Sequence, residues 1–274
     1  MSNLVSTEWL AAHLKDVRVV DASWYMPDEK REPAKEFEAG HIPGAMFFDI
    51  DGIADRSSGL PHMLPSPGEF SKAVGALGIG DGEMVVGYDG SGLFSAPRLW
   101  WTFKAMGHDK VKVLDGGFPK WKREGRAVET GPAHPANKFF TAIANPAILR
   151  GFAQVMDIVG DRSAQMVDAR SAARFKAEEP EPRAGVRGGH MPGAVNVHYR
   201  KLIADDGTLK PPEGLRGAFD AIDLERPIVT TCGSGLTAAI LMLALDEIGA
   251  KDVALYDGSW TEWGGRPEAP VVTG

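Results

Sequence analysis

The chain has 274 residues, of which 43% are hydrophobic, and a formal net charge of −7 at pH 7. Two domains of ordinary size fit this length, and the acidic balance excludes a protein that binds nucleic acid or an anionic membrane through general positive charge. A single cysteine excludes a disulfide framework and favours a reducing compartment. Because the N-terminus lacks a secretory pattern and no run of about 18 apolar residues occurs, we expect a cytoplasmic protein with neither membrane spans nor nucleic-acid partners.

The first half of the chain alternates between short β-branched runs and amphipathic stretches. Ser6 or Thr7 is expected to cap a helix that continues through Leu14. Strands are predicted at 17–21, 46–50, 84–88 and 111–114, and further helices at 67–77, 94–106 and 118–124. Strands that alternate with helices predict an α/β fold, in which a small parallel sheet is covered by helices on both faces.

A proline-containing stretch separates this half from the next. Residues 129–145 include Pro132 and Pro135 and are predicted to form a linker. A helix from about Pro146 through Val159 then opens the second half. We therefore divide the chain into an N-terminal domain at 4–128, a linker at 129–145 and a C-terminal domain at 146–274.

The second half repeats the first. Four patterns recur in the same order, shifted by 142 to 149 residues: 19–23 at 166–170, 40–45 at 189–194, 85–93 at 229–236, and 114–117 at 256–259. Markers in one order with a nearly constant shift predict a duplicated domain. His41 and His190 recur in both copies and are therefore interpreted as part of the turn architecture rather than of catalysis.

The only cysteine stands where the strand at 228–231 gives way to a helix that continues through Leu245. Backbone N–H groups in such a turn favour negative charge, so Cys232 is expected to react as a thiolate. The Gly-Ser-Gly that follows is expected to leave the sulfur open to an incoming group. The alternative is a buried and inert cysteine, a common fate of a free thiol.

The neighbours of Cys232 exclude several chemistries. A cysteine phosphatase needs an arginine six positions later to grip phosphate, and this chain has Ala238 there, with Thr231 in the place of the usual histidine. A disulfide oxidoreductase needs a second cysteine, and a metal site needs more ligands than one thiolate. We therefore expect no metal and no cofactor. A nucleophile that holds one extra atom or a small anion remains.

The loop Cys232-Gly233-Ser234-Gly235-Leu236-Thr237-Ala238 resembles the active loop of the rhodanese-type sulfurtransferases, in particular that of the 3-mercaptopyruvate branch. Nearly the whole chain, about residues 4 to 264, shares the resemblance, which implies two tandem rhodanese-like domains. It implies that Cys232 takes sulfane sulfur from 3-mercaptopyruvate as a persulfide, releases pyruvate, and passes the sulfur to cyanide or to a thiol such as a thioredoxin-like protein. The first domain has Asp89 at the cysteine position, which implies a catalytically silent copy. In open α/β sheets the site forms at the carboxyl ends of the strands, so we expect it in the cleft between the two domains.

The resemblance also implies roles for particular residues. Arg174 and Arg183 correspond to two arginines that hold the carboxylate and keto oxygens of the donor, a task that suits a guanidinium fork. The remaining substrate-binding positions would be the loop residues whose amides surround the persulfide: Gly233, Gly235, Leu236 and Thr237. Without the resemblance, both arginines would be interpreted as surface residues paired with the glutamates of the same segment.

A proton relay is the last implied feature. Asp51 and His62 match family segments of the first domain that supply an acid and a histidine, and together with Ser234 they could deliver a proton to the departing enolate. Two other functions stay open. One is transfer of sulfur from thiosulfate, and the other is a regulatory rhodanese module without turnover.

Overall fold

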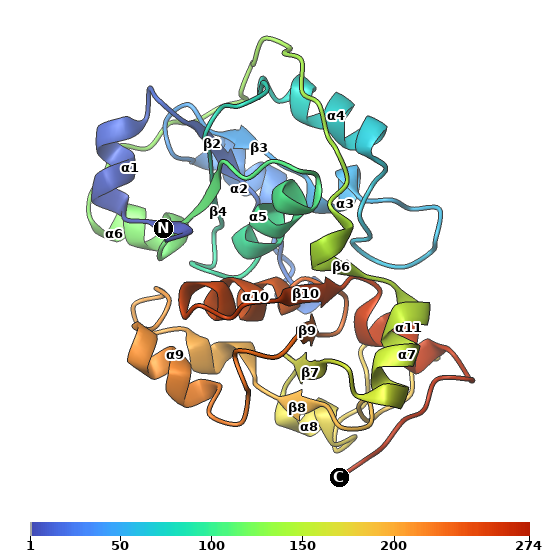
Figure 1. Cartoon of the computed structure of the whole chain (residues 1–274). Coiled ribbons are helices and arrows are strands. Elements are labelled where there is room, and N and C mark those ends of the chain that lie inside the picture. The colour runs from blue at the N-terminus through green and yellow to red at the C-terminus, as the bar shows by residue number, and fades with distance from the viewer. Residues whose placement is uncertain (1) are drawn as a thin grey trace. The chain divides into compact units, whose positions relative to one another are not determined.

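The computed structural model describes residues 2–274, which form two compact units (Figure 1). The first unit consists of the chain up to Asp55 together with Leu64–Asn145 and Ala204–Leu209. The second consists of Arg56–Met63, Pro146–Ile203 and Lys210–Gly274. Each unit is built around one sheet.

The first sheet has five strands in the order β1-β5-β4-β2-β3, and all neighbours are parallel. Its strands are β1 (Leu4–Val5), β2 (Arg18–Asp21), β3 (Met46–Phe47), β4 (Val85–Tyr88) and β5 (Val111–Leu114). The helices of this unit are α1 (Thr7–His13), α2 (Pro33–Ala39), α3 (Ile50–Ile53), α4 (Pro67–Ala76), α5 (Ala96–Ala105) and α6 (Gly117–Arg123), with a 3-10 turn at Pro27–Glu29.

Alternate residues of β4 divide these helices between the two faces of the sheet. Val86 and Tyr88 join a buried cluster with apolar side chains of α1, α2 and α6. Gly87 points to the other face, where a side chain would collide with Leu99 of α5. The four residues of β4 are all buried. A strand buried on both faces explains why its sequence is a continuous apolar run.

The second unit repeats this arrangement. Its sheet has the parallel order β6-β10-β9-β7-β8, with strands β6 (Leu149–Arg150), β7 (Gln165–Asp168), β8 (Val195–Asn196), β9 (Ile228–Thr231) and β10 (Val253–Tyr256). The helices are α7 (Phe152–Asp161), α8 (Ala172–Phe175), α9 (Pro212–Ala218), α10 (Ala238–Glu247) and α11 (Ser259–Gly265), with 3-10 turns at Pro146–Ile148 and Tyr199–Leu202. Side chains of α7 and α11 pack with those of β9 and β10 in one cluster, and α10 also packs against both strands. The predicted α/β fold with a duplicated parallel sheet is confirmed.

Two of the predicted elements are wrong in their extent. The strand expected at 46–50 ends at Phe47, because the Asp49 side chain accepts a hydrogen bond from the amide of Gly52 and caps α3. The helix expected from Pro146 begins only at Phe152, since Leu149–Arg150 pairs with β10 as an edge strand. Residues 129–145, expected as a linker, run over the first unit, where the Phe140 ring packs between those of Phe70 and Phe103.

The repeated histidines have the same structural task in both units. The Nδ1 of His41 bonds to the carbonyl of Phe37 at 2.8 Å, and that of His190 bonds to the carbonyl of Phe175 at 2.9 Å. Each imidazole also stacks on the phenylalanine that it bonds. These contacts are consistent with their interpretation as structural residues. In the described chain no helix is long and apolar enough to cross a membrane.

Candidate active site

Backbone hydrogen bonds from α11 fix the loop that carries Cys232. The amide of Trp260 donates to the carbonyl of Cys232, and the amide of Thr261 donates to the carbonyl of Gly233, both at 2.9 Å. The Ser259 hydroxyl accepts from the amide of Cys232 at 3.2 Å and donates to the carbonyl of Tyr256 at 2.8 Å. The backbone at the cysteine is therefore fixed by bonds on both of its sides.

The sulfur is not open in the way that the sequence suggested. Cys232 is only 2% exposed, and Ser234 and Leu236 beside it are buried as well. Gly235 has a φ of 78°, which favours glycine, so the glycine serves the tight turn of the loop rather than access from solvent. The expectation of an exposed thiol is thus wrong for this structure.

The equivalent loop of the first unit shows what its amides can bind. Asp89 stands at the cysteine position and is fully buried. Its carboxylate accepts four backbone hydrogen bonds of 2.8–2.9 Å, from the amides of Ser91, Phe94, Ser95 and Ala96. The first copy therefore encloses a carboxylate of its own, and its loop is an anion cradle that is already filled.

In the second copy the cradle has a thiol at its centre. By the repeat of this loop, Ser91 and Phe94 correspond to Ser234 and Thr237. No oxygen of residues 2–274 accepts from the amides of Ser234, Leu236 or Thr237. These N–H groups are available to negative charge that develops on an atom attached to Cys232.

Arg174 lies directly against this loop. A Cβ added to Gly233 would stand 3.0 Å from an Nη atom of Arg174. Glu181 holds the guanidinium from the other side, at 2.5 Å, and also binds Arg170 at 2.7 Å. The predicted pairing of Arg174 with a nearby glutamate is therefore present together with its position at the cysteine loop, and the glutamate orients the arginine.

Arg170 completes this cluster and is buried. Its guanidinium binds both carboxylate oxygens of Asp168, donates to the carbonyl of Gly189 at 2.8 Å, and lies 4.2 Å from the centre of the Trp260 ring. Burial alone would lower the pKa of Arg170, but the ion pairs with Asp168 and Glu181 outweigh it and raise that pKa. The guanidinium is a fixed part of the fold under the loop.

Arg183 is linked to the same loop through the side chain of Thr261. Its Nη1 lies 3.4 Å from the hydroxyl of Thr261, and that hydroxyl donates to the carbonyl of Gly233 at 2.6 Å. Both predicted arginines thus converge on Gly233, one directly and the other through Thr261. Arg174 approaches from α8 and Arg183 from the segment between α8 and β8.

The three relay residues belong to three different segments of the chain. Ser234 is buried within the cysteine loop. His62 is buried in Arg56–Met63, which belongs to the second unit, and has a left-handed φ of 59°. Asp51 lies in α3 of the first unit and accepts from the indole of Trp24 at 2.8 Å. Their action as a relay stays a prediction.

Two residues of the site were missed by sequence analysis: Ser259 and Thr261. Ser259 has a φ of 48°, and the first copy has Gly117 there with a φ of 54°. Alignment of the two copies places this serine opposite a glycine, and that difference could have drawn attention to Ser259. Thr261 carried no such signal, because its partner Gly233 lies far away in the sequence. Glu181 was expected as a surface partner of the arginines, but its side chain is only 4% exposed. No group of three or more His, Cys, Asp or Glu side chains in the described chain could hold a metal ion.

The structure thus defines a protein of two parallel α/β units, the second of which has a buried cysteine among loop amides. The Rhodanese-like domain model matches residues 6–124 and 152–266. The chain belongs to the rhodanese-like domain family, as the loop sequence predicted.

Relatives of known name match along almost the full length. The human 3-mercaptopyruvate sulfurtransferase is 43% identical over 283 residues, which cover 99% of this chain and 95% of the human protein. The bovine thiosulfate sulfurtransferase is 43% identical over 284 residues, with coverage of 99% and 95%. The crystal structure of SseA from Escherichia coli superposes with a TM-score of 0.88 at 39% identity, covering 95% of this chain and 99% of that one.

Proposed function

We propose that this protein is a sulfurtransferase that moves the sulfur of 3-mercaptopyruvate to an acceptor through a persulfide on Cys232. The observation that carries the proposal is the comparison of the two loops. The first copy fills its cradle with the Asp89 carboxylate, while the second presents amides without a chain acceptor around a thiol. A persulfide anion supplies the negative charge that such amides stabilise.

The chemistry balances as two displacements. The Cys232 thiolate attacks the sulfur of 3-mercaptopyruvate, an S–S bond forms, and the C–S bond breaks with its electron pair passing to the carbon. The resulting enolate takes up one proton and leaves as pyruvate. An acceptor thiolate then attacks the outer sulfur, the S–S bond breaks, and the thiolate of Cys232 is restored. Cyanide as acceptor would leave as thiocyanate.

Arg174 and Arg183 are the groups that would hold the donor. A 2-keto acid presents a carboxylate and a neighbouring keto oxygen, and two guanidinium groups converging on one loop match that spacing of acceptors. The arginine held by Glu181 is oriented before the donor arrives, which lowers the entropy lost on binding. Gly233 permits this approach because it has no side chain in the path of Arg174.

Ser234, His62 and Asp51 are proposed to supply the proton to the enolate. We propose a thioredoxin-like thiol as a protein acceptor and the cytoplasm as the location, both as predictions from the sequence. Thiosulfate is the second candidate donor, since a relative of equal identity is named a thiosulfate sulfurtransferase. The loop argues for the keto acid, because neither Gly233 nor Ser234 offers a cation for a dianion.

Mass spectrometry of the donor-treated protein tests the nucleophile. Incubation with 3-mercaptopyruvate and no acceptor should add one sulfur, about 32 Da, because Cys232 is the only thiol. Cys232→Ser should lose both the added mass and turnover. Turnover in that variant, or an unmodified wild-type protein, would rule out the persulfide.

The ratio of kcat/KM for the two donors tests the substrate. Removing one arginine of a charged contact costs about 2–5 kcal/mol, so Arg183→Ala and Arg174→Ala should each lower use of 3-mercaptopyruvate at least tenfold more than use of thiosulfate. Arg226→Ala, an exposed arginine bonded to the carbonyl of Arg162, is the matched control. A wild-type preference for thiosulfate, or an unchanged ratio in both variants, contradicts the assignment.

A further inference from the structure

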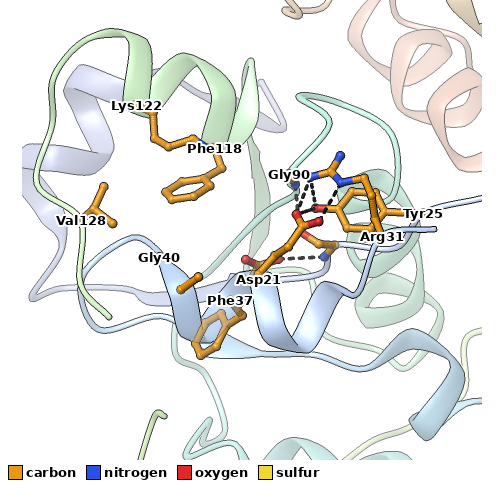
Figure 2. Close-up of a pocket in the computed structure, with 12 residues that line it drawn as sticks. Asp21, Tyr25, Arg31, Phe37, Gly40, Gly90, Phe118, Lys122 and Val128 are labelled. Atoms are coloured by element: carbon orange, nitrogen blue, oxygen red, sulfur yellow. Dashed lines mark hydrogen bonds and ion pairs between the residues drawn. The ribbon is translucent and has the colours of Figure 1, made fainter. Parts of the chain in front are cut away.

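The silent unit contains a cavity of about 290 Å³ beside its own copy of the loop. Figure 2 shows Phe118 and Lys122 on one side of it and Asp21 with Arg31 on the other. Phe37 and Val128 add apolar walls. Nothing in the proposed sulfur transfer uses this cavity, since the cysteine belongs to the other unit.

In the second unit an arginine side chain, Arg170, lies at the position that corresponds to the cavity. There the Arg170 guanidinium binds Asp168, the carbonyl of Gly189 and Glu181, and lies over the Trp260 ring. All of these contacts are buried, with the side chains of Arg170 and Asp168 each 1% exposed. This is a complete receptor for one planar cation.

The first unit keeps counterparts of three of these four groups, without one for Glu181, and lacks the cation. In the repeat, Asp168 corresponds to Asp21, Gly189 to Gly40, and Trp260 to Phe118, and all three counterparts line the cavity. Arg170 corresponds to Ser23, whose hydroxyl reaches no further than Asp21 and the amide of Gly90. The position of the buried arginine is thus held in the first unit by a short serine that lines the cavity.

The cavity is lined by two carboxyl groups, Asp21 and Glu36, and by two basic groups, Arg31 and Lys122. Arg174 precedes the phenylalanine bonded to His190, and the residue in that place of the first copy is Glu36. The basic group that faces the cysteine loop has thus been replaced by an acidic one. Arg31 is already bound to Glu36 and donates to the hydroxyl of Tyr25 at 2.8 Å.

Asp21 itself is buried without a cationic partner. It accepts from the amide of Ser23 at 2.8 Å and from the Ser23 hydroxyl, and no lysine, arginine or histidine of residues 2–274 forms an ion pair with it. A buried carboxyl group gains most from a cation that can form hydrogen bonds with it. Lys122 is exposed at the rim, with its ammonium 4.6 Å from the centre of the Phe118 ring.

We propose that this cavity binds a small guanidinium compound with a short apolar substituent. Its planar cation takes the place that Arg170 has in the other copy, between the Asp21 carboxylate and the Phe118 ring. The substituent packs against Phe37 and Val128. The class of ligand follows from the receptor that the duplicated unit displays in its filled form.

Calorimetric titration of the full chain with N-butylguanidinium tests the proposal, with N-butylurea as a neutral compound of the same shape. One saturable site is expected for the guanidinium and none for the urea. Asp21→Asn should weaken binding at least tenfold, whereas Asp109→Asn, at an exposed aspartate of the same unit, should not change it. Equal binding of the urea, or no binding of the guanidinium to wild type, would overturn the proposal.

Two further variants keep the test independent of how Asp21→Asn folds. Ser23→Arg supplies the side chain present in the second copy, so it should abolish binding and raise the melting temperature. Lys122→Ala removes a competing positive charge and should tighten binding. Weaker binding of the guanidinium in Lys122→Ala would contradict a cation held at this place, and unchanged binding in Ser23→Arg would place the ligand elsewhere. Because binding is measured without a sulfur donor, these results are independent of the proposed transfer reaction.

Discussion

Asp89→Ala is expected to unfold the silent unit more easily without impairing the chemistry of the folded enzyme. The substitution removes a carboxylate that accepts four backbone hydrogen bonds at 2.8–2.9 Å in a fully buried position. Hydrogen bonds to a charged group contribute about 1.5–3 kcal/mol each, but they share one acceptor and are not additive. The four amides would lose their acceptor at about 1–3 kcal/mol for each that stays buried and unpaired, so we expect a total loss of about 3–5 kcal/mol after the loop relaxes.

Urea denaturation followed by tryptophan fluorescence would measure this effect. Five of the seven tryptophans lie in the first unit, so its unfolding dominates the signal. Asp89→Asn keeps one oxygen for the amides and should fall between wild type and Asp89→Ala. A loss below about 1 kcal/mol would refute the view that the carboxylate holds the loop. A large fall in kcat for the folded variant would show that the first copy takes part in the reaction.

Two further substitutions probe the residues that support the cysteine loop. Ser259→Gly removes the hydroxyl between Cys232 and Tyr256 while tolerating the φ of 48°, and should lower the unfolding free energy by about 1 kcal/mol and lower kcat in steady-state assays. Ser163→Gly, at an exposed serine, is its control, and equal behaviour of the two would contradict the role of Ser259. Glu181→Gln keeps the shape but loses the charge that orients Arg174, so kcat/KM for 3-mercaptopyruvate should fall at least tenfold in the same assays. Glu178→Gln, whose side chain is 62% exposed, should show no such fall.

The sequence predicted the duplication because the repeat markers occupy strand ends, where turn geometry restricts the residue type. Short edge strands escaped prediction, since the two residues of β1 and of β6 are too few to show a period. Asp89 was interpreted only as the sign of a catalytically silent copy. Its carboxylate accepts hydrogen bonds from four backbone amides, and these depend on the path of the backbone in the folded protein. A pattern of residue types does not reveal that path.

In the site, too, residues that are adjacent in sequence could be predicted, whereas contacts between residues far apart in the sequence could not. Cys232 and its glycines are adjacent in sequence, and the family resemblance located them. The convergence of Arg174, Glu181 and Thr261 on Gly233 joins three separate segments. The cavity beside Ser23 was visible only as a serine aligned with Arg170, a difference whose meaning depends on the volume around it.

The pH dependence of stability offers a test of Asp21 that needs no ligand. Burial raises the pKa of this carboxyl from 3.8 to about 6. The hydrogen bonds from Ser23 and Tyr88 lower this pKa, and the nearby Asp89 raises it. The folded state therefore holds a proton that the unfolded state has already lost between these two pH values. Stability must fall as pH rises through this window, and a shift of this size corresponds to roughly 3 kcal/mol.

Asp21→Asn cannot lose that proton. The difference in unfolding free energy between variant and wild type should therefore move in favour of the variant by roughly 3 kcal/mol from about pH 4 to above pH 6. Glu83 and Glu124, whose pKa values lie near 2, act in the opposite direction at lower pH, but they are present in both proteins and cancel in the difference. Arg31, Glu36, Tyr25 and Lys122 line the same cavity and are likewise common to both. A difference that stays constant across the window would mean that Asp21 is ionised in the folded protein at acid pH, and hence that a cation already neutralises it.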